Sequence, residues 1–314
     1  MRNDLVVFSG NANLELSREI AKNLKIKLGK IFVGKFADGE IRIKIEENVR
    51  GKDCFIIQPT CPPVNDNLLE LSIITDALLR ASANRITAVI PYYGYARQDR
   101  KAEPRVPITA KLVANLLTAS GIDRILAMDL HAGQLQGFFD IPVDHLYATP
   151  VFLGFFKDKR FVNQNKELCI VSPDAGGVER ARAFAKRLQA SLVIIDKRRP
   201  APNQSSIMNI IGDVKNKTTV LLDDLIDTGG SLINAATALK AQGAYKVFAA
   251  CSHGVLSGNA IERIEDSVIE RLLVTDSIPL KRPSKKIIVL SVGTLLADAI
   301  KRIHNEESVS NLFV

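Results

Sequence analysis

The sequence predicts an α/β protein with two duplicated domains, each containing a mainly parallel sheet flanked by helices. Strand-like and helix-like segments alternate along nearly the whole chain, which is the pattern of parallel sheets. The length of 314 residues suits about two domains. A composition of 46% hydrophobic and 24% charged residues is ordinary for a globular protein with real cores.

An approximate internal repeat, offset by roughly 163 residues, indicates the duplication. Each copy contains a strand–helix–strand series followed by a second such series. The expected segments are 6–8, 14–24, 31–33, 54–58, 68–81 and 86–90 in the first copy, and 168–171, 178–188, 192–195, 220–224, 232–241 and 246–250 in the second. We expect an N-terminal domain at 1–147 and a C-terminal domain at 148–314, joined near 148–157.

The segment from Thr219 to Ser231 carries the most information about function. An apolar strand ends in two adjacent carboxylates, Asp223 and Asp224, and a helix begins after a short loop. The loop residues are Asp227, Thr228, Gly229, Gly230 and Ser231. Strand ends of open α/β sheets bind ligands, glycines allow close approach, and N–H groups at a helix start suit a phosphate.

The two carboxylates refine this prediction. They can accept hydrogen bonds from sugar hydroxyls or hold Mg²⁺ through water. An ordinary strand–turn–helix would explain the glycines and an Asp at the helix start, but not both carboxylates in register with the strand. The segment therefore predicts a site for a phosphorylated sugar.

The two copies differ at this loop. The first copy has Gln58–Pro63, in which Pro62 and Pro63 cannot donate N–H groups to a phosphate. The second copy should therefore bind the sugar phosphate, and the first should have another role. A nucleotide-hydrolase P-loop at 29–36 is excluded, because Phe36 stands where Ser or Thr must reach the metal.

Two segments of the first copy are candidates for ligand contacts. Asp38 and Gly39 form a strong turn signal before an alternating strand at 41–45, so a hairpin is expected there. The segment 91–101 follows a predicted strand and combines tyrosines with arginine and glutamine. Such side chains can stack on a purine, hydrogen-bond to it or clamp phosphates.

Two more segments contain candidate metal and phosphate groups. Asp129 and His131 would share one face if the preceding strand continues, so Asp129 could orient the imidazole. His145 has no such neighbour and is interpreted as structural. The run Asp-Lys-Arg-Arg-Pro at 196–200 is either a solvated basic turn or a closing loop that brings cations to a transferring phosphoryl group.

Together these segments resemble the ribose-phosphate diphosphokinase family, or phosphoribosyl diphosphate synthetases, of the ATP-using bacterial and animal type. The resemblance extends from Ser9 to Ser310. Its motifs are Asp-Gly-Glu, Tyr-Ala-Arg-Gln-Asp-Arg-Lys, Asp-Leu-His, Ser-Pro-Asp-Ala-Gly-Gly, Lys-Arg-Arg-Pro and the sugar-phosphate loop. It implies two phosphoribosyltransferase-like domains and transfer of the β,γ-diphosphoryl group of MgATP to O1 of ribose 5-phosphate, leaving AMP.

The resemblance also implies roles for individual residues. ATP would contact Phe36, Asp38, Gly39, Glu40, Arg97, Gln98 and His131, some of them from a neighbouring subunit. Ribose 5-phosphate would contact Arg199, Asp223, Asp224, Asp227, Thr228, Gly229, Gly230 and Ser231. Mg²⁺ would be held near His131 and Asp174, and Lys197 and Arg199 would be the catalytic cations. Ala37 and Ser231 depart slightly from the family pattern, and the segment 102–107 is less typical of it.

Two other functions stay open at this point. A phosphoribosyltransferase would share the sugar-phosphate loop but needs no ATP site, and a catalytically inactive regulatory relative would not need the catalytic cations. The family analogy further implies a homohexamer with active sites between subunits, activated by phosphate and inhibited by ADP, in which the last residues can pack back onto the N-terminal domain.

Composition excludes several other classes of partner. The net charge of +8 suits anionic ligands, but Trp is absent and no basic stripe with interleaved aromatics occurs, so nucleic acid is not expected. No apolar run approaches the roughly 18 residues of a membrane span. Without a signal peptide the expected location is the cytoplasm. The four cysteines lack metal-ligand spacing and are expected to be small buried thiols.

Overall fold

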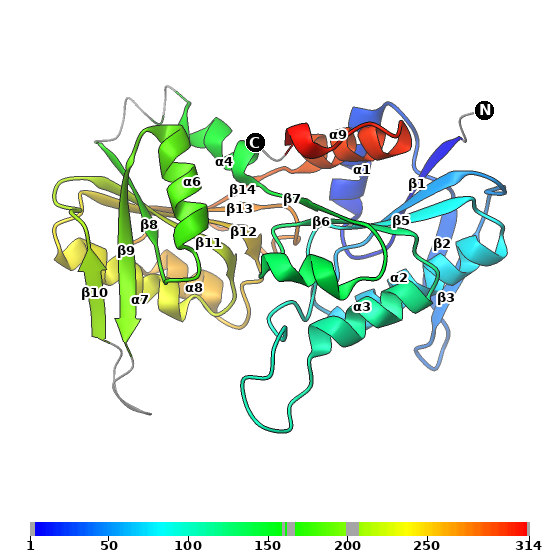
Figure 1. The fold of residues 1–314 in the computed structure, drawn as a ribbon, viewed down its shortest axis with the longest axis horizontal. Coiled ribbons are helices and arrows are strands. Elements are labelled where there is room, and N and C mark those ends of the chain that lie inside the picture. The colour runs from blue at the N-terminus through cyan, green and yellow to red at the C-terminus, as the bar shows by residue number, and fades with distance from the viewer. Residues whose placement is uncertain (1–3, 159–160, 162–166, 199–206, 313–314) are drawn as a thin grey trace. The chain divides into compact units, whose positions relative to one another are not determined.

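The structure is a computed structural model that describes residues 4–158, 161, 167–198 and 207–312 (Figure 1). The chain divides into two compact units. Unit 1 contains residues 1–147, 277–279 and 291–314, and unit 2 contains residues 148–276 and 280–290. In the described part of the chain, no helix is long and apolar enough to cross a bilayer.

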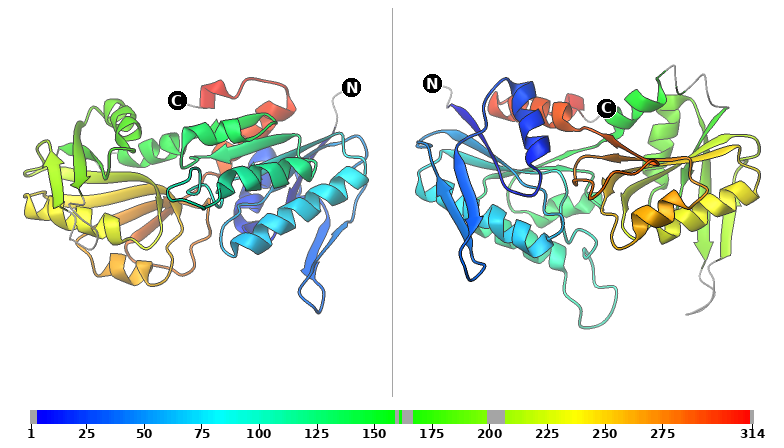
Figure 2. Two further views of the ribbon diagram at one scale, coloured as in Figure 1. Left: turned by 60° about the horizontal axis from the view of Figure 1, so that its bottom comes forward. Right: turned by 180° about the vertical axis from the view of Figure 1, so that it is seen from behind.

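Unit 1 contains a five-stranded parallel sheet in the order β1-β4-β5-β6-β7. These strands are β1 (Leu5–Ser9), β4 (Asp53–Ile57), β5 (Arg85–Ile90), β6 (Arg124–Met128) and β7 (Val143–Leu146). The helices are α1 (Leu14–Leu24), α2 (Val64–Arg80), α3 (Thr109–Ala119) and α9 (Gly293–His304), with 3-10 helices η1 (Gly133–Phe138) and η2 (Ser310–Leu312). Strands β2 (Ile31–Lys35) and β3 (Ile41–Ile45) form a separate antiparallel hairpin. Helices α1 and α9 cover one face of the parallel sheet, and α2 and α3 cover the other (Figures 1 and 2).

Unit 2 contains a seven-stranded sheet in the order β10-β9-β8-β11-β12-β13-β14. Its strands are β8 (Leu168–Ser172), β9 (Ser191–Arg198), β10 (Ile207–Ile211), β11 (Thr218–Ile226), β12 (Lys246–Gly254), β13 (Arg271–Thr275) and β14 (Ile287–Leu290). Its described helices are α4 (Thr149–Phe156), α6 (Val178–Leu188), α7 (Gly230–Ala241) and α8 (Ala260–Glu265). Strand β10 pairs antiparallel with β9, while the other described neighbours in the sheet are parallel.

The strand orders of the two units show the same topology. The series β8-β11-β12-β13-β14 of unit 2 corresponds to β1-β4-β5-β6-β7 of unit 1, and an antiparallel pair follows the first helix in both. In unit 2 this pair extends the main sheet through β9, whereas in unit 1 it is a sheet of its own. The predicted α/β class, with parallel sheets flanked by helices, is confirmed.

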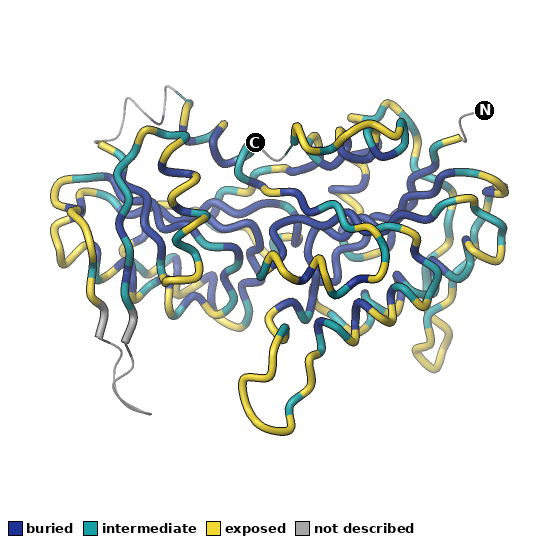
Figure 3. The backbone as a smooth tube through the Cα atoms, viewed as in Figure 1, coloured by how far each residue is buried: buried dark blue, intermediate teal, exposed yellow. Residues whose placement is uncertain are grey.

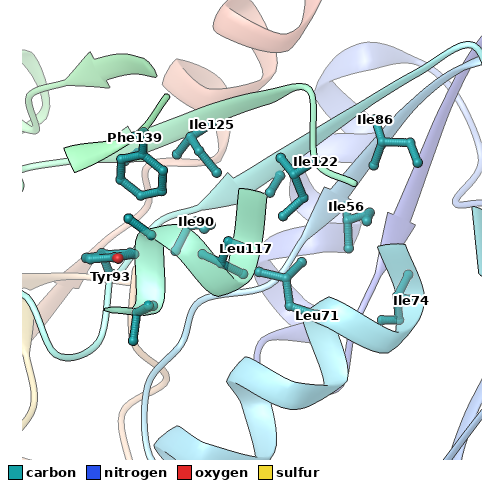
Figure 4. Close-up of a cluster of buried hydrophobic side chains, with 14 of the residues drawn as sticks. Ile56, Leu71, Ile74, Ile86, Ile90, Tyr93, Leu117, Ile122, Ile125 and Phe139 are labelled. Atoms are coloured by element: carbon teal, nitrogen blue, oxygen red, sulfur yellow. The ribbon is translucent and has the colours of Figure 1, made fainter. Parts of the chain in front are cut away.

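The strands of both sheets form the buried layer of each unit (Figure 3). All five residues of β4 are buried, and β11 is buried from Thr218 to Leu222. The strands are buried on both faces rather than alternately, because helices cover both faces of a parallel sheet. In unit 1 the side chains of Ile56, Leu71 and Leu117 belong to one buried cluster between the sheet and its helices (Figure 4). The four cysteines are buried free thiols.

A charged cluster holds the end of α9 to the sheet of unit 1. Asp53 and Arg85 are opposite each other on β4 and β5, and the Arg85 guanidinium donates two hydrogen bonds to the Asp53 carboxylate, at 2.8 and 2.6 Å. Arg85 also donates to the carbonyl of Ile303 at 3.1 Å, and the His304 ring lies 2.8 Å from the same carboxylate. The Asp53 side chain is only 4% exposed. Since α1 packs against α9 as well, the C-terminal helix is an integral part of unit 1.

Replacing Asp53 with Asn should therefore lower the free energy of unfolding by about 2 kcal/mol, because Arg85 and His304 would be left beside a neutral amide. Urea denaturation at pH 7, followed by circular dichroism, measures the change. The control is Asp76→Asn, which removes an exposed partner of Arg80 and should leave the free energy of unfolding nearly unchanged. Equal effects of the two substitutions would contradict the role assigned to Asp53.

Candidate active site

Two adjacent carboxylates, Asp223 and Asp224, lie near the carboxyl end of β11, which continues to Ile226. They come just after Leu221, the last residue paired with β8, and Asp223 is still paired with Cys251 of β12. Asp224 is 6% exposed and Asp223 is partly exposed. The Asp224 N–H donates to Asp223 Oδ1 at 2.9 Å, and Arg180 of α6 lies 3.5 Å from the Asp224 carboxylate. Ligands of open parallel sheets bind at this edge, so the fold places both carboxylates where the sequence predicted a site.

The two carboxylates disfavour each other's ionisation. Burial, and then the hydrogen bond and charge of Asp224, raise the pKa of Asp223 from 3.8 to about 8. The charge of Asp174 acts in the same direction. At neutral pH the pair therefore holds a proton, which a bound cation or a set of hydroxyl donors would displace or share.

The loop after β11 has the form of an anion cradle. Gly229 has φ 74° and ψ −4°, a left-handed conformation that glycine adopts without steric cost. Helix α7 begins at Gly230, and the first N–H groups of a helix have no partner within it. Within the described residues, the N–H groups of Gly229 and Gly230 donate to no protein acceptor. Such donors at a helix start bind phosphate.

The loop after β8 brings Asp174 to the same edge of the sheet, because β8 and β11 are parallel neighbours. Asp174 Oδ1 accepts a hydrogen bond from the Gly177 N–H at 2.9 Å, at the start of α6. The residue is exposed, so its second carboxylate oxygen can face a ligand. Mg²⁺ usually keeps several waters and takes only one or two carboxylates beside substrate phosphates. The oxygen donors of Asp174 and the neighbouring carboxylates fit such an ion, although the described residues include no cluster of three side chains able to hold a metal by themselves.

The predicted catalytic cations lie partly outside the described residues. The backbone of Lys197 belongs to β9 and pairs with Met208 of β10, but its side chain is not described. Arg199 lies outside the described residues altogether.

The predicted hairpin is present in unit 1. Gly39, with φ 96°, turns the chain, the Phe36 N–H donates to the Glu40 carbonyl at 2.8 Å, and Asp38 accepts from the Glu40 N–H at 3.1 Å. The Phe36 ring is 49% exposed, and the Arg42 guanidinium lies 5.4 Å from its centroid. An exposed ring with a cation on it is able to stack on a planar ligand.

Arg97 and Gln98 follow β5 and are both exposed. The backbone of Gln98 is fixed by a bond from its N–H to the Tyr95 carbonyl, at 2.9 Å. The neighbouring loop, after β6, contains His131, which is also exposed. A contact of 3.5 Å between Gln134 and Asp99 joins the two loops, so Arg97, Gln98 and His131 lie on loops at the same sheet edge.

The expectation that Asp129 and His131 share one face of a continued strand is wrong. Strand β6 ends at Met128, and Asp129 takes a positive φ of 40° and is 3% exposed, whereas His131 is exposed. The buried His145, which the sequence left as structural, instead holds this loop: its Nε2 accepts a hydrogen bond from the Leu130 N–H at 2.9 Å. A strand cannot continue through a left-handed residue, so the polar neighbour of His131 turns into the protein.

Comparisons with known proteins decide the family. Residues 5–121 match the model of the N-terminal domain of ribose phosphate pyrophosphokinase, and residues 198–314 match the phosphoribosyl synthetase-associated domain. A ribose-phosphate pyrophosphokinase of Campylobacter jejuni is 58% identical over 98% of both chains. One from Helicobacter pylori J99 is 56% identical over 98% of this chain and 95% of the relative. The crystal structure of phosphoribosylpyrophosphate synthetase from Mycobacterium smegmatis is 40% identical, with a TM-score of 0.91 over 97% of this chain and 100% of that one.

The chain belongs to the ribose-phosphate pyrophosphokinase family. The resemblance drawn from the sequence motifs is confirmed, and the protein is accordingly an enzyme, a transferase of this family. Neither a phosphoribosyltransferase nor a regulatory relative is supported over this assignment.

In unit 1, the loop after β1 corresponds to the Asp174 loop of unit 2. It is bound by a carboxylate, Glu70, that the sequence analysis did not identify. The buried Glu70 of α2 accepts hydrogen bonds from the Asn11 N–H at 2.7 Å, the Asn11 amide at 3.0 Å and the Gln58 amide at 2.8 Å. Gln58 in turn accepts from the Ala12 N–H at 3.1 Å. In unit 1 these donors are therefore already bound to an internal carboxylate.

Two cations of unit 2 were also missed by the sequence analysis. Arg180 approaches Asp224, and Arg263 of α8 donates to the carbonyl of Thr228 at 3.1 Å. Arg180 lies within the first turn of α6, directly after the Ser-Pro-Asp-Ala-Gly-Gly motif. Its position next to that motif could have identified it as a candidate site residue. Nothing in the sequence near Arg263 connects it with the phosphate loop.

The raised pKa of Asp223 predicts a pH-dependent stability. This pKa is about 8 in the folded protein and near 4 in the unfolded chain, so the unfolded chain releases its proton at lower pH. Between these two values, the free energy of unfolding of the wild type should therefore fall as pH rises, by up to about 1.4 kcal/mol per pH unit. Asp223→Asn cannot ionise, so its melting temperature should exceed that of the wild type by an amount that grows from pH 5 to 8 and is constant above. Differential scanning calorimetry without divalent metal measures the difference in melting temperature between the two proteins. A difference that stays the same at every pH would contradict the raised pKa of Asp223.

Proposed function

We propose that the protein transfers the β,γ-diphosphoryl group of MgATP to O1 of D-ribose 5-phosphate, giving 5-phospho-α-D-ribose 1-diphosphate and AMP. The observation that carries the proposal is the carboxylate pair of β11 followed by the glycine cradle at the start of α7, in a chain of this family. A cradle for one phosphate beside acceptors for sugar hydroxyls fits ribose 5-phosphate better than a free phosphate.

In the proposed complex, unit 2 binds the sugar. The N–H groups and hydroxyls of the loop Asp227–Ser231 hold the 5-phosphate, and Asp223 and Asp224 accept hydrogen bonds from the ribose hydroxyls. This arrangement directs O1 at the β-phosphorus. The O1–P bond forms as the bond from the β-phosphorus to the oxygen bridging to the α-phosphorus breaks, AMP leaves with that oxygen, and the O1 proton goes to solvent.

The cations complete the site. Lys197 and Arg199 neutralise charge on the non-bridging oxygens during transfer, since phosphoryl transfer depends mainly on positioning and charge neutralisation. Asp174 and His131 would hold Mg²⁺, which supplies further neutralisation of the diphosphoryl oxygens when bound. The exposed Phe36, with Asp38, Gly39 and Glu40 of the hairpin and Arg97 and Gln98, would form the ATP side of the site.

The assembly and its regulation are part of the same proposal. Family analogy supports a homohexamer with active sites between subunits, and the exposed side chains of Phe32 and Phe36 on the β2–β3 hairpin could contact a neighbouring chain. Inorganic phosphate and ADP are proposed as effectors by family analogy, and the cytoplasm as the location of the enzyme. The N-terminal domain at 1–147 would serve the nucleotide and the C-terminal domain at 148–314 the sugar phosphate.

The experiment that tests the activity is AMP formation from MgATP with and without ribose 5-phosphate, with the β-phosphorus followed by ³¹P NMR. AMP formed only with the sugar, together with a diphosphate on C1, is expected. Binding of both ligands without turnover would favour an inactive regulatory relative instead, and activity only with an added nucleobase would favour a phosphoribosyltransferase.

Lys197→Ala should lower turnover by a factor on the order of 10²–10⁵, as the loss of other groups that stabilise transferring phosphoryl or oxyanion charge does. Initial rates of AMP formation at saturating substrates measure the loss. Lys186→Ala, which removes an exposed cation from the last turn of α6, is the matched control and should keep wild-type turnover. Near-normal turnover of Lys197→Ala would show that its assigned role is wrong.

A further inference from the structure

The sugar-phosphate loop rests against α8, a short helix that the proposed chemistry does not use. A Cβ built on Gly229 would lie 3.7 Å from the Ile264 side chain, so α8 packs directly against the loop. The helix is braced from its other side: Glu262 pairs with Arg282 at 2.8 Å, and Glu265 accepts from the Ser284 hydroxyl at 2.7 Å. The loop therefore has a fixed support.

Arg263 of this helix makes a specific contact with the loop backbone. Its Nη1 donates to the Thr228 carbonyl at 3.1 Å, and its Nη2 lies 3.4 Å from where a Cβ of Gly230 would be. In the described part of the chain, no carboxylate pairs with this guanidinium. The Arg263 charge is therefore not neutralised by an ion pair. Its hydrogen bond to the Thr228 carbonyl is directed at a single peptide group.

The contact determines which way that peptide faces. The bond between Thr228 and Gly229 is trans, since the cis bond among the described residues is between Pro62 and Pro63. In a trans peptide the C=O and the N–H point in opposite directions. Because the Thr228 carbonyl faces Arg263 and α8, the Gly229 N–H faces away from α8. Gly229 is a buried residue, and buried N–H groups without an acceptor are rare in proteins.

A glycine at this position allows a second orientation. The φ and ψ of Gly229, 74° and −4°, are those of the third residue of a type II turn. Rotation of the preceding peptide converts this geometry into that of a type I turn, with φ near −90°, which glycine also adopts. In that orientation the Thr228 carbonyl oxygen, rather than the Gly229 N–H, would face the phosphate and repel it.

We propose that Arg263 is a positioning residue for ribose 5-phosphate. By binding the Thr228 carbonyl, it selects the peptide orientation in which the Gly229 N–H is available to the 5-phosphate. The inference rests on the proposed function of the loop as the phosphate cradle. It predicts an effect on the binding of ribose 5-phosphate and not on ATP binding or on the transfer step.

The first test is steady-state kinetics of Arg263→Met, which removes the donor but keeps an unbranched side chain. The KM for ribose 5-phosphate should rise roughly tenfold, as expected for the loss of a charged hydrogen bond, while kcat and the KM for ATP stay within about twofold. Arg263→Lys, which keeps one donor, should recover most of the loss. Arg282→Met, which removes a cation that braces α8 without touching the loop, should leave all three constants unchanged. An unchanged KM in Arg263→Met, or an equal effect of Arg282→Met, would overturn the proposal.

A double-mutant cycle separates positioning from a direct contact of Arg263 with the phosphate. Gly229→Ala has room for its Cβ but disfavours the positive φ, so it should itself shift the peptide to the second orientation. If Arg263 acts through this peptide, Arg263→Met should raise the KM little further in the Gly229→Ala background. Additive effects of the two substitutions would overturn the positioning role. Melting temperatures of all variants identify any that fail to fold, and binding of ribose 5-phosphate by calorimetry in the folded ones replaces kinetics if turnover is lost.

A wrong assignment of the sugar-phosphate site would give a different set of results from a wrong role for Arg263. If Ser231→Ala and Asp224→Asn also left the KM for ribose 5-phosphate unchanged, the loop would not be the sugar-phosphate site. If those variants weaken binding while Arg263→Met does not, the site assignment stands and the role of Arg263 is wrong.

Discussion

The structure of the candidate site depends on parallel pairing at the centre of unit 2. Strands β8, β11 and β12 run in the same direction, so the loops that follow them open at one edge of the sheet. This pairing brings Asp174 to the carboxylates of β11, although about fifty residues separate them in the sequence. The same pairing places α6, with Arg180, beside Asp224. Without this pairing, Asp174 and Arg180 would not lie beside the acidic pair of β11.

The two copies of the duplicated fold differ in what lies at this edge of the sheet. Both units have the same order of five parallel strands, and a loop faces the same edge at each equivalent strand. In unit 1 the donors at that edge bind Glu70 and Gln58, which belong to the protein. A Cβ on Gly10 would come within 2.3 Å of the Gln58 side chain, so a larger residue there would displace this amide. This edge therefore holds an internal carboxylate in unit 1, whereas in unit 2 it holds the carboxylate pair and the glycine loop after β11.

Most of the fold could be predicted from the sequence, because strands buried on both faces are continuous apolar runs and α1 and α6 carry a regular amphipathic pattern. The turn after β11 and the start of α7 could be predicted as well, since the residues from Asp227 to Ser231 are contiguous. The turn at Asp129 could not, because a positive φ in a residue other than glycine is imposed by contacts such as that of His145 with Leu130. The contacts of Glu70 and Arg263 join residues distant in the chain, and a local pattern contains no sign of them.

The buried carboxylates differ in how far the protein itself compensates their charge. Asp53 is matched by a bidentate arginine and a histidine, and Glu70 by three donors. Both carboxylates are therefore stabilised by the protein alone, and both hold structure in place. Asp223 faces another carboxylate instead, which helps raise its pKa to about 8. Such a pair gives the folded chain no stability by itself, and its place at the open edge of a sheet fits the hydroxyl donors and cations of the proposed substrate complex.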